Sequence, residues 1–106
     1  MKNTASRLQV RHFRLIQAIK DTGQLSEAAD RLSITQPAAS RTLAETERIA
    51  GHNLFERHPK GMKPNSIGIA LCRRADALLA ELDLAETEIA AVISGHSGTV
   101  RIGAVT

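Results

Sequence analysis

An apolar repeat in the last third of the sequence constrains the fold more than any other feature. From residue 66 to about Ile93, apolar residues recur at steps that alternate between three and four along most of the segment. This heptad pattern is typical of a helix that packs against another helix. A helix of about 28 residues is about 42 Å long, longer than the small domain before it. We therefore favour packing against a second copy over packing on its own domain.

The repeat thus predicts a long helix, capped by Asn65 or Ser66, through which two copies of the chain form a dimer. Such pairing would hold two identical domains at a fixed separation, as dyad-related binding sites require. The residues of this predicted dimerisation stripe are Leu71, Ala75, Leu78, Leu82, Ala85 and Ile89, with Ile67 and Val92 continuing it at either end.

Three shorter helices are predicted ahead of the long one. They run from Val10 to about Lys20, from Leu25 to Leu32 and from Gln36 to about Ala50, where apolar residues recur at helical spacing. Ser33-Ile34 leaves only a tight turn between the second and third, and Thr35 is a suitable N-cap for the third. The residues predicted to face the core are Val10, Phe13, Ile16, Ile19, Ala28, Ala29, Leu32, Ala39 and Leu43.

A short basic hairpin is predicted between the third helix and the long one. Leu54–Arg57 reads as a strand, residues 58–61 as a turn, and Met62-Lys63 as a short returning strand. Two helices joined by a tight turn and followed by such a hairpin have the layout of a winged helix-turn-helix. We therefore predict a mainly α fold, with three helices and a two-stranded wing, followed by the long dimerisation helix.

This layout predicts binding to double-stranded DNA through the third helix. The major groove admits one α-helix, whose leading residues meet the base edges. Glutamine can pair with adenine, arginine with guanine or phosphate, and small apolar groups suit a thymine methyl. The candidate groove-reading residues are Thr35, Gln36, Pro37, Ala38, Ser40 and Arg41, and weaker candidates for backbone contacts are Arg11, His12 and Arg31.

The charge distribution agrees with a polyanionic partner for the first part of the chain only. Residues 1–65 carry eleven Lys and Arg against six Asp and Glu, a net charge of +5, whereas residues 66–106 carry three against five, a net charge of −2. Two Phe, with no Tyr or Trp, argue against a protein that stacks unpaired bases, so an RNA-binding module is the weaker alternative.

No catalytic or metal-binding pattern is recognisable in the sequence. The four His residues share no ligand spacing with each other or with Cys72, the single cysteine, which we interpret as a small buried residue. We predict no enzyme activity, no metal and no cofactor in this chain. One cysteine, no apolar run of membrane-spanning length and no secretory signal indicate a cytoplasmic protein.

Three spaced motifs resemble the N-terminal DNA-binding domain, with its linker helix, of LysR-type transcriptional regulators. They are the runs from Ser26 to Arg41, from Gly51 to Arg57 and from Thr99 to Gly103. The chain departs from the usual motif at Thr46, where leucine is common, and at Pro64-Asn65, where Leu-Thr is common. We expect a weaker inner face of the third helix at the first departure and a short second strand at the second.

The resemblance implies an interrupted inverted repeat as target, a dimer or tetramer, and a small-molecule inducer sensed by a C-terminal domain that this fragment lacks. It implies a wing that follows the DNA backbone or minor groove through Arg57, Lys60, Gly61 and Lys63. It divides the chain into a DNA-binding domain (1–65), a linker helix (66–94), and a hinge with the first strand of a truncated effector domain (95–106). A protein-interaction module that no longer touches DNA is the remaining alternative.

Overall fold

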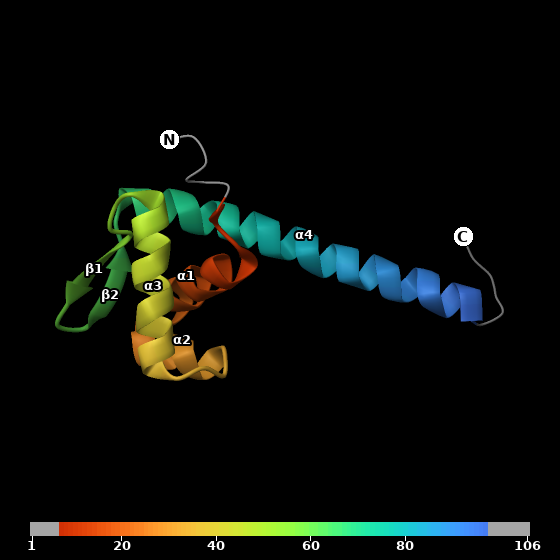
Figure 1. Ribbon diagram of the computed structural model, residues 1–106, viewed down its shortest axis with the longest axis horizontal. Coiled ribbons are helices and arrows are strands. Elements are labelled where there is room, and N and C mark those ends of the chain that lie inside the picture. The colour runs from red at the N-terminus through yellow and green to blue at the C-terminus, as the bar shows by residue number, and fades with distance from the viewer. Residues whose placement is uncertain (1–6, 98–106) are drawn as a thin grey trace.

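The computed structural model describes residues 7–97 and shows a helical body from which one long helix projects (Figure 1). The body consists of α1 (Val10–Thr22), α2 (Leu25–Arg31), α3 (Gln36–Ala50) and the antiparallel strands β1 (Phe55–His58) and β2 (Gly61–Pro64), which form the wing. The projecting helix is α4 (Ser66–Ser97). The predicted fold class, a winged helix-turn-helix followed by a long helix, is confirmed.

Two boundaries differ from the prediction. The second strand includes Gly61 and Pro64, because Phe55 pairs with Pro64 at the open end of the hairpin, where a missing N–H is tolerated. Helix α4 continues to Ser97, so residues 95–97, which we expected in a hinge, are helical. The strand predicted within 99–105 lies outside the described residues.

Local hydrogen bonds explain where the helices begin and how they turn. The Thr35 hydroxyl accepts the N–H of Ala38 at 3.2 Å, and the Asn65 side chain accepts the N–H of Gly68 at 2.8 Å, so both predicted N-caps are confirmed. Between α2 and α3, Ser33 adopts a left-handed φ of 58°. The N–H of Ile34 then reaches the carbonyl of Ala29 at 3.0 Å, which closes the tight turn.

The core lies where α1 meets α2, α3 and the first part of α4. The largest fully buried apolar side chains are Leu15, Ile16, Ile19 and Leu54. Two of the residues of α1 that were predicted to face the core differ from the prediction. The prediction is wrong for Val10, which is 45% exposed, and only partly right for Phe13, which is half-buried. Since α1 is packed on several sides, its buried surface is wider than one stripe and includes His12, Leu15 and Ala18 as well as the predicted Ile16 and Ile19.

Two side chains with hydrogen-bonding groups that reach the core, Thr46 and Cys72, are each directed at a backbone carbonyl. Thr46 is fully buried, and its hydroxyl donates to the Thr42 carbonyl at 2.6 Å within the same helix. Cys72 is 1% exposed, and its thiol points to the Ile16 carbonyl at 3.7 Å. Burial raises the pKa of the Cys72 thiol to about 11. The prediction that Cys72 is a buried, unreactive residue agrees with this environment.

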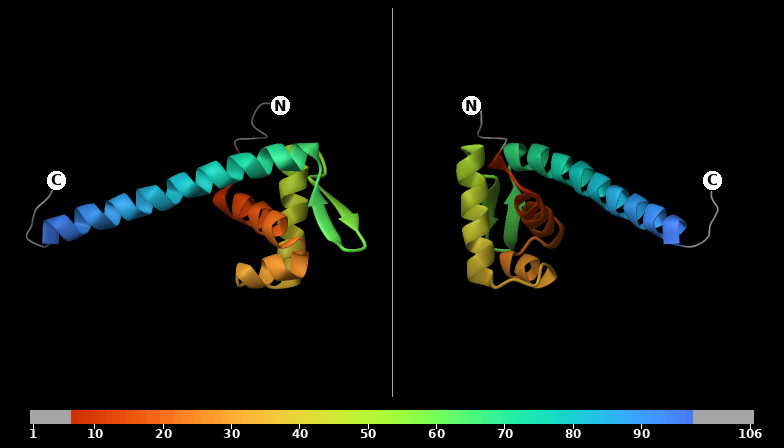
Figure 2. Two further views of the ribbon diagram at one scale, coloured as in Figure 1. Left: turned by 180° about the vertical axis from the view of Figure 1, so that it is seen from behind. Right: turned by 45° about the vertical axis from the view of Figure 1, so that its right-hand side comes forward.

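Helix α4 is attached to the body by its first part alone. A Cβ at Gly68 would overlap the carbonyl oxygen of Leu54, so the start of α4 lies directly against the chain that leads into β1. Further along, Cys72, Ala75 and Leu79 are buried against the body, and no residue between 80 and 95 is buried. Both views in Figure 2 show no other element beside the second part of α4.

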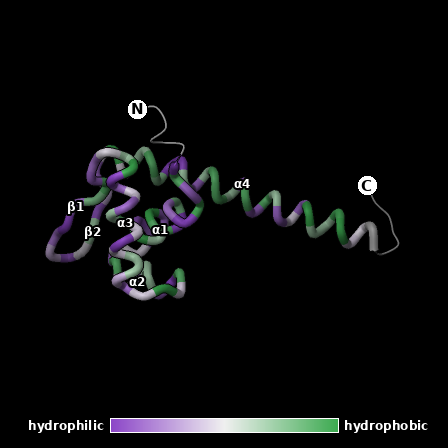
Figure 3. Tube along the Cα trace, viewed as in Figure 1, coloured by the Kyte–Doolittle hydropathy of each residue, from purple (hydrophilic) through white to green (hydrophobic). Residues whose placement is uncertain are grey.

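This attachment corrects part of the predicted dimerisation stripe. Ala75 is completely buried in its own body, and Leu71 is half-buried against the same core. Neither is free to face a second copy in full, because the body covers the side of α4 on which Ala75 lies. Leu78 and Ile89 remain 51% and 59% exposed, and hydrophobic colour recurs along the free part of α4 in Figure 3.

Candidate nucleic-acid interface

The leading turns of α3 present a polar face to solvent. Gln36, Pro37, Ser40 and Arg41 are exposed and Ala38 is half-buried, whereas Ala39 on the opposite side is completely buried. Within residues 7–97, no hydrogen bond or ion pair engages the side chains of Gln36, Ser40 or Arg41. These groups are therefore free to bind an external partner. Thr35 also lies at this end, with its oxygen already used as the N-cap.

The wing stands beside this end of α3 and is held there by the backbone that follows α1. The N–H of Met62 donates to the Gly23 carbonyl at 2.8 Å, and the Gln24 side chain donates to the Lys60 carbonyl at 3.2 Å. Gly61 has a φ of 139°, and a Cβ there would overlap the Gly23 oxygen. The structure thus gives Gly61 a packing role that sequence reasoning did not foresee, and it adds Gln24 as a residue that orients the wing.

The basic side chains of the wing point away from the core. Arg57, Lys60 and Lys63 are exposed, while Phe55 and Met62 on the same strands are buried and attach the wing to the body. A groove separates the wing from the starts of α2 and α3. Its lining includes Gln24, Ser26, Gln36, Arg57, His58 and Pro59. The wing and the leading end of α3 therefore form one concave surface with amide, hydroxyl and cationic groups.

One of the weaker predicted contacts was wrong. His12 is 1% exposed, its Nδ1 accepts the N–H of Gln9 at 2.8 Å, and its Nε2 lies 3.0 Å from Glu45. Because Nδ1 accepts a backbone proton, Nε2 carries the ring proton and donates it to the carboxylate. His12 therefore links α1 to α3 and has no free nitrogen for a phosphate.

The two arginines of that group remain exposed but are paired within the chain. Arg11 donates to both Glu45 oxygens, at 3.0 and 3.2 Å, and Arg31 donates to Asp21 at 3.3 Å. Hydrogen bonds from His12 and then Arg11 hold the pKa of the Glu45 carboxyl below its usual range. A polyanion would have to compete with these carboxylates for the two guanidinium groups.

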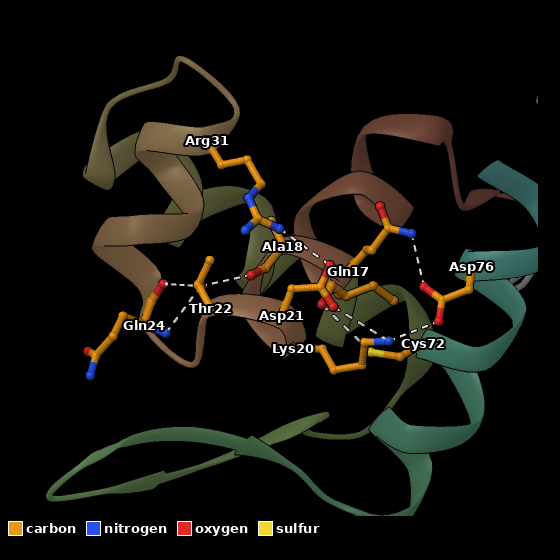
Figure 4. A network of polar contacts seen from close by, with 10 residues as sticks. Gln17, Ala18, Lys20, Asp21, Thr22, Gln24, Arg31, Cys72 and Asp76 are labelled. Carbon is orange, nitrogen blue, oxygen red and sulfur yellow. Dashed lines mark hydrogen bonds and ion pairs between the residues drawn. The ribbon is translucent and has the colours of Figure 1, made fainter. Parts of the chain in front are cut away.

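A polar cluster also joins α1 to α4 (Figure 4). Asp76 accepts a hydrogen bond from Gln17 at 2.9 Å and one from Lys20 at 2.8 Å. Lys20, and secondarily Gln17, lower the pKa of the Asp76 carboxyl, and Asp76 in turn raises the pKa of Lys20. Periodicity could not reveal this cluster, because its members lie more than 50 residues apart in the chain.

Other kinds of site find no support in the part of the chain that the structure describes. No three His, Cys, Asp or Glu side chains there are grouped so that they could hold a metal ion. Among the same residues, no helix combines the length and apolar character needed to cross a membrane. The concave surface made by α3 and the wing is therefore the candidate functional site.

Comparisons with known protein sequences point to one family. The sequence profile of "Bacterial regulatory helix-turn-helix protein, lysR family" matches residues 10–69. The HTH-type transcriptional regulator GbpR of Azospirillum brasilense is 41% identical over 100 residues, which are 94% of this chain and 29% of that protein. The small neutral protease regulatory protein of Streptomyces coelicolor is 36% identical over 96 residues, 91% of this chain and 29% of that protein. The chain thus spans less than a third of these relatives.

Solved structures agree with the sequence comparisons. The DNA-binding domain of BenM, crystallised in complex with catB site 1 DNA, superposes with a TM-score of 0.79 at 30% identity. That alignment covers 84% of this chain and 99% of the other. The DNA-binding domain of CbnR, also crystallised with DNA, has a TM-score of 0.73 at 24% identity and covers 81% of this chain and 99% of its own. At that level of identity the second likeness concerns the fold.

Proposed function

The chain belongs to the lysR family of bacterial DNA-binding transcription regulators, and we propose that it binds an interrupted inverted repeat as a dimer or tetramer. The observation that carries the proposal is the free polar face of α3 beside a basic wing. Gln36, Ser40 and Arg41 have no partner within residues 7–97, although each carries groups that can read base edges. A helix-turn-helix that served only protein interaction would have no need of this combination.

The two parts of the surface have different tasks in this proposal. The leading residues of α3 enter the major groove and supply base preference, with Thr35, Pro37 and Ala38 shaping the contact and Gln36, Ser40 and Arg41 donating to bases or phosphates. The wing follows the adjacent backbone, where Arg57, Lys60 and Lys63 neutralise phosphates without reading sequence. Gly61 contributes by allowing the wing to lie close to α1.

Pairing of two chains through the free part of α4 completes the proposed binding mode. Leu78, Leu82, Ala85 and Ile89 lie on one side of this helix, where Leu82 is half-buried and the other three are exposed. An exposed apolar surface of this length is unfavourable in water unless another surface covers it. A second α4 would cover it and place two α3 helices at a fixed separation. A tetramer would add a further interface outside this chain.

The remaining parts of the proposal concern the longer protein. We infer that a C-terminal domain senses a small-molecule inducer and changes how the dimer engages DNA, and that the protein acts in the cytoplasm, where the chromosome lies. The first inference comes from the family resemblance, and this chain spans 29% of the GbpR sequence that it matches. The second comes from the single cysteine, which fits a reducing compartment. No residue of the present chain is assigned to inducer binding.

The test begins with selection of duplexes from a random pool, which yields the half-site and its spacing. Gln36→Ala is then expected to relax preference at one base position, with a cost of about 1–3 kcal/mol on the selected site. Lys60→Ala is expected to weaken all duplexes alike and to reduce the slope of log affinity against log salt by about one. Arg73→Ala removes one positive charge from α4 and serves as the control. It is expected to leave the base preference and the salt slope unchanged.

Two results would contradict the proposal. Absence of duplex binding at low salt would favour the protein-interaction alternative, because phosphate neutralisation is strongest there. An equal and uniform loss of affinity in Gln36→Ala and Lys60→Ala would show that α3 and the wing do not divide base reading and backbone contact between them.

A further inference from the structure

Asp76 connects the projecting helix to the body through both of its carboxylate oxygens. Oδ1 accepts from the Gln17 amide at 2.9 Å, and Oδ2 accepts from the Lys20 ammonium at 2.8 Å. Gln17 and Lys20 lie one turn apart on α1, so the carboxylate bridges two successive positions of that helix (Figure 4). A bridge of this kind restrains the position of α4 along α1 and the rotation of α4 about its own axis.

The apolar contacts of α4 do not impose the same restraint. Cys72, Ala75 and Leu79 are buried against the body, but burial of apolar surface is not directional and is compatible with small changes in helix angle. Charge-assisted hydrogen bonds depend on distance and angle. The start of α4 is held at Asn65 and Gly68, which contact Asn53 and Leu54. Asp76 thus provides a second point of attachment about 12 Å further along the helix.

The bridge also continues toward the helix-turn-helix. Lys20 lies 3.7 Å from Asp21, and Asp21 lies 3.3 Å from Arg31 at the end of α2. Alternating charges therefore run from α2 through α1 to α4. Each member is partly exposed, and pairs of this kind contribute little to stability. A role in geometry is a better physical explanation for this arrangement than a role in stability.

A small change in the angle between α4 and the body would move the leading end of α3 by about the distance between neighbouring base pairs. The last turn of α3 lies next to the start of α4, and the leading residues of α3 lie at the far end of the body (Figure 1). Over its 15 residues, α3 spans about 22 Å. A pivot of about 10° at the start of α4 would therefore move Gln36 by about 4 Å, close to the rise of about 3.4 Å per base pair.

We propose that Asp76 is a positioning residue that holds α4 at a fixed angle to the body and thereby sets the half-site spacing that a dimer accepts. This inference rests on the proposed pairing through α4. It assigns to Asp76 no contact with DNA and none with the partner subunit. Without the bridge, each body pivots about the start of α4, and the dimer tolerates half-sites at several separations.

The experiment uses the full chain and duplexes in which two selected half-sites are separated by spacers that increase one base pair at a time. Affinity is measured by fluorescence anisotropy at one salt concentration, together with affinity for a single half-site. For the unaltered chain we expect one best spacer, with affinity at least about tenfold lower two base pairs away. For Asp76→Ala we expect this ratio to fall to about threefold or less, with affinity for the single half-site unchanged.

Asp83→Ala is the matched control, because it removes the same charge from the same helix beyond the contacts with the body. It should keep the spacer profile of the unaltered chain. Asp76→Asn, which retains an acceptor oxygen but loses the charge, should give an intermediate profile. Circular dichroism and sedimentation confirm that each variant is folded and has the same mass.

The outcomes separate the inference from the function on which it rests. A sharp optimum in the unaltered chain that Asp76→Ala retains overturns the inference alone. An equal loss of affinity on every spacer and on the single half-site also overturns it, because Asp76 would then support the DNA-binding body itself. An unaltered chain that binds single half-sites but has no preferred spacer overturns the proposed dimer and the inference together.

Discussion

The two parts of α4 carry one continuous apolar repeat but lie in different surroundings. Before residue 80, Ala75 and Leu79 are 0% and 6% exposed; after it, Leu84 and Ile89 are 61% and 59% exposed. Ala75 belongs to the predicted dimerisation stripe, and Leu79 lies on a neighbouring side of the helix. A heptad repeat thus indicates that a helix packs against something, but it does not identify the partner. The argument from helix length holds only for the second part.

The contrast between the covered and the exposed apolar residues of α4 is tested most directly by substitutions on its exposed side. Leu78→Glu with Leu82→Glu should weaken dimerisation by at least about 1000-fold, or about 4 kcal/mol, because four leucines per dimer leave an apolar interface and each, being only partly exposed in the single chain, contributes about 1 kcal/mol or more. Analytical ultracentrifugation measures the change. Leu84→Glu, on another side of the same helix, is the control and should leave the dimer intact. An unchanged dimer in the double variant would show that this stripe is not the interface.

Truncation of one leucine in each part of α4 tests the contrast in burial. Leu79→Ala should lower the free energy of unfolding by about 2–5 kcal/mol, since it removes a buried side chain and leaves a cavity. Leu84→Ala should change it by less than about 0.5 kcal/mol, as is usual for an exposed position. Urea denaturation measures both. Similar losses in the two variants would mean that α4 is covered equally along its length.

The thiol in the attached part of α4 gives a smaller effect that depends on pH. Burial raises the pKa of Cys72 from the ordinary value of 9.0 to about 11 in the folded chain, so the folded state keeps its proton where the unfolded state loses it. The contribution of Cys72 to stability is therefore fully present below pH 9 and lost as pH rises through 11, by about 2–3 kcal/mol. Urea midpoints across this range measure it.

Cys72→Ala supplies the reference for that measurement. The two proteins share every other ionisable group, so only the difference between the two pH profiles reports on the thiol. A constant difference from pH 8 to pH 11 would show that Cys72 is accessible to water in the folded chain.

The smallest expected effect on stability concerns Asp76. Its pair with Lys20 is partly exposed, with side-chain exposures of 33% for Lys20 and 45% for Asp76, so Asp76→Ala should cost less than about 1 kcal/mol. Thermal unfolding at low and high salt measures this, with Asp83→Ala as reference. A loss of several kcal/mol would instead make Asp76 a main support of the body.

Local chemistry made the fold and the leading end of α3 predictable from sequence. Thr35 and Asn65 act as caps because their side chains bond to N–H groups three residues away, an interaction that short sequence spacing reveals. The exposed side of α3 followed from the same helical spacing that buries Ala39 and Leu43. These features depend on neighbours in the chain, so no knowledge of the tertiary structure was needed.

Features set by distant segments were not predictable in this way. His12 looked like an exposed basic residue, but the carboxylate that its ring meets is Glu45, 33 positions later. Ala75 fitted the dimerisation repeat, yet the core of its own body covers it. The orientation of the wing depends on Gln24, which lies 36 positions before Lys60. In each case the deciding partner comes from another element, and one-dimensional periodicity contains no information about it.

The close approach of Gly61 to Gly23 limits how this protein can be engineered. Any side chain at position 61 would push the hairpin away from the body, and every basic group on the hairpin would shift with it. A library that seeks new DNA preferences should therefore randomise Pro59 and Lys60 and leave both glycines unaltered. Hairpins grafted from other proteins will fit this scaffold only if they bring a glycine to the same place.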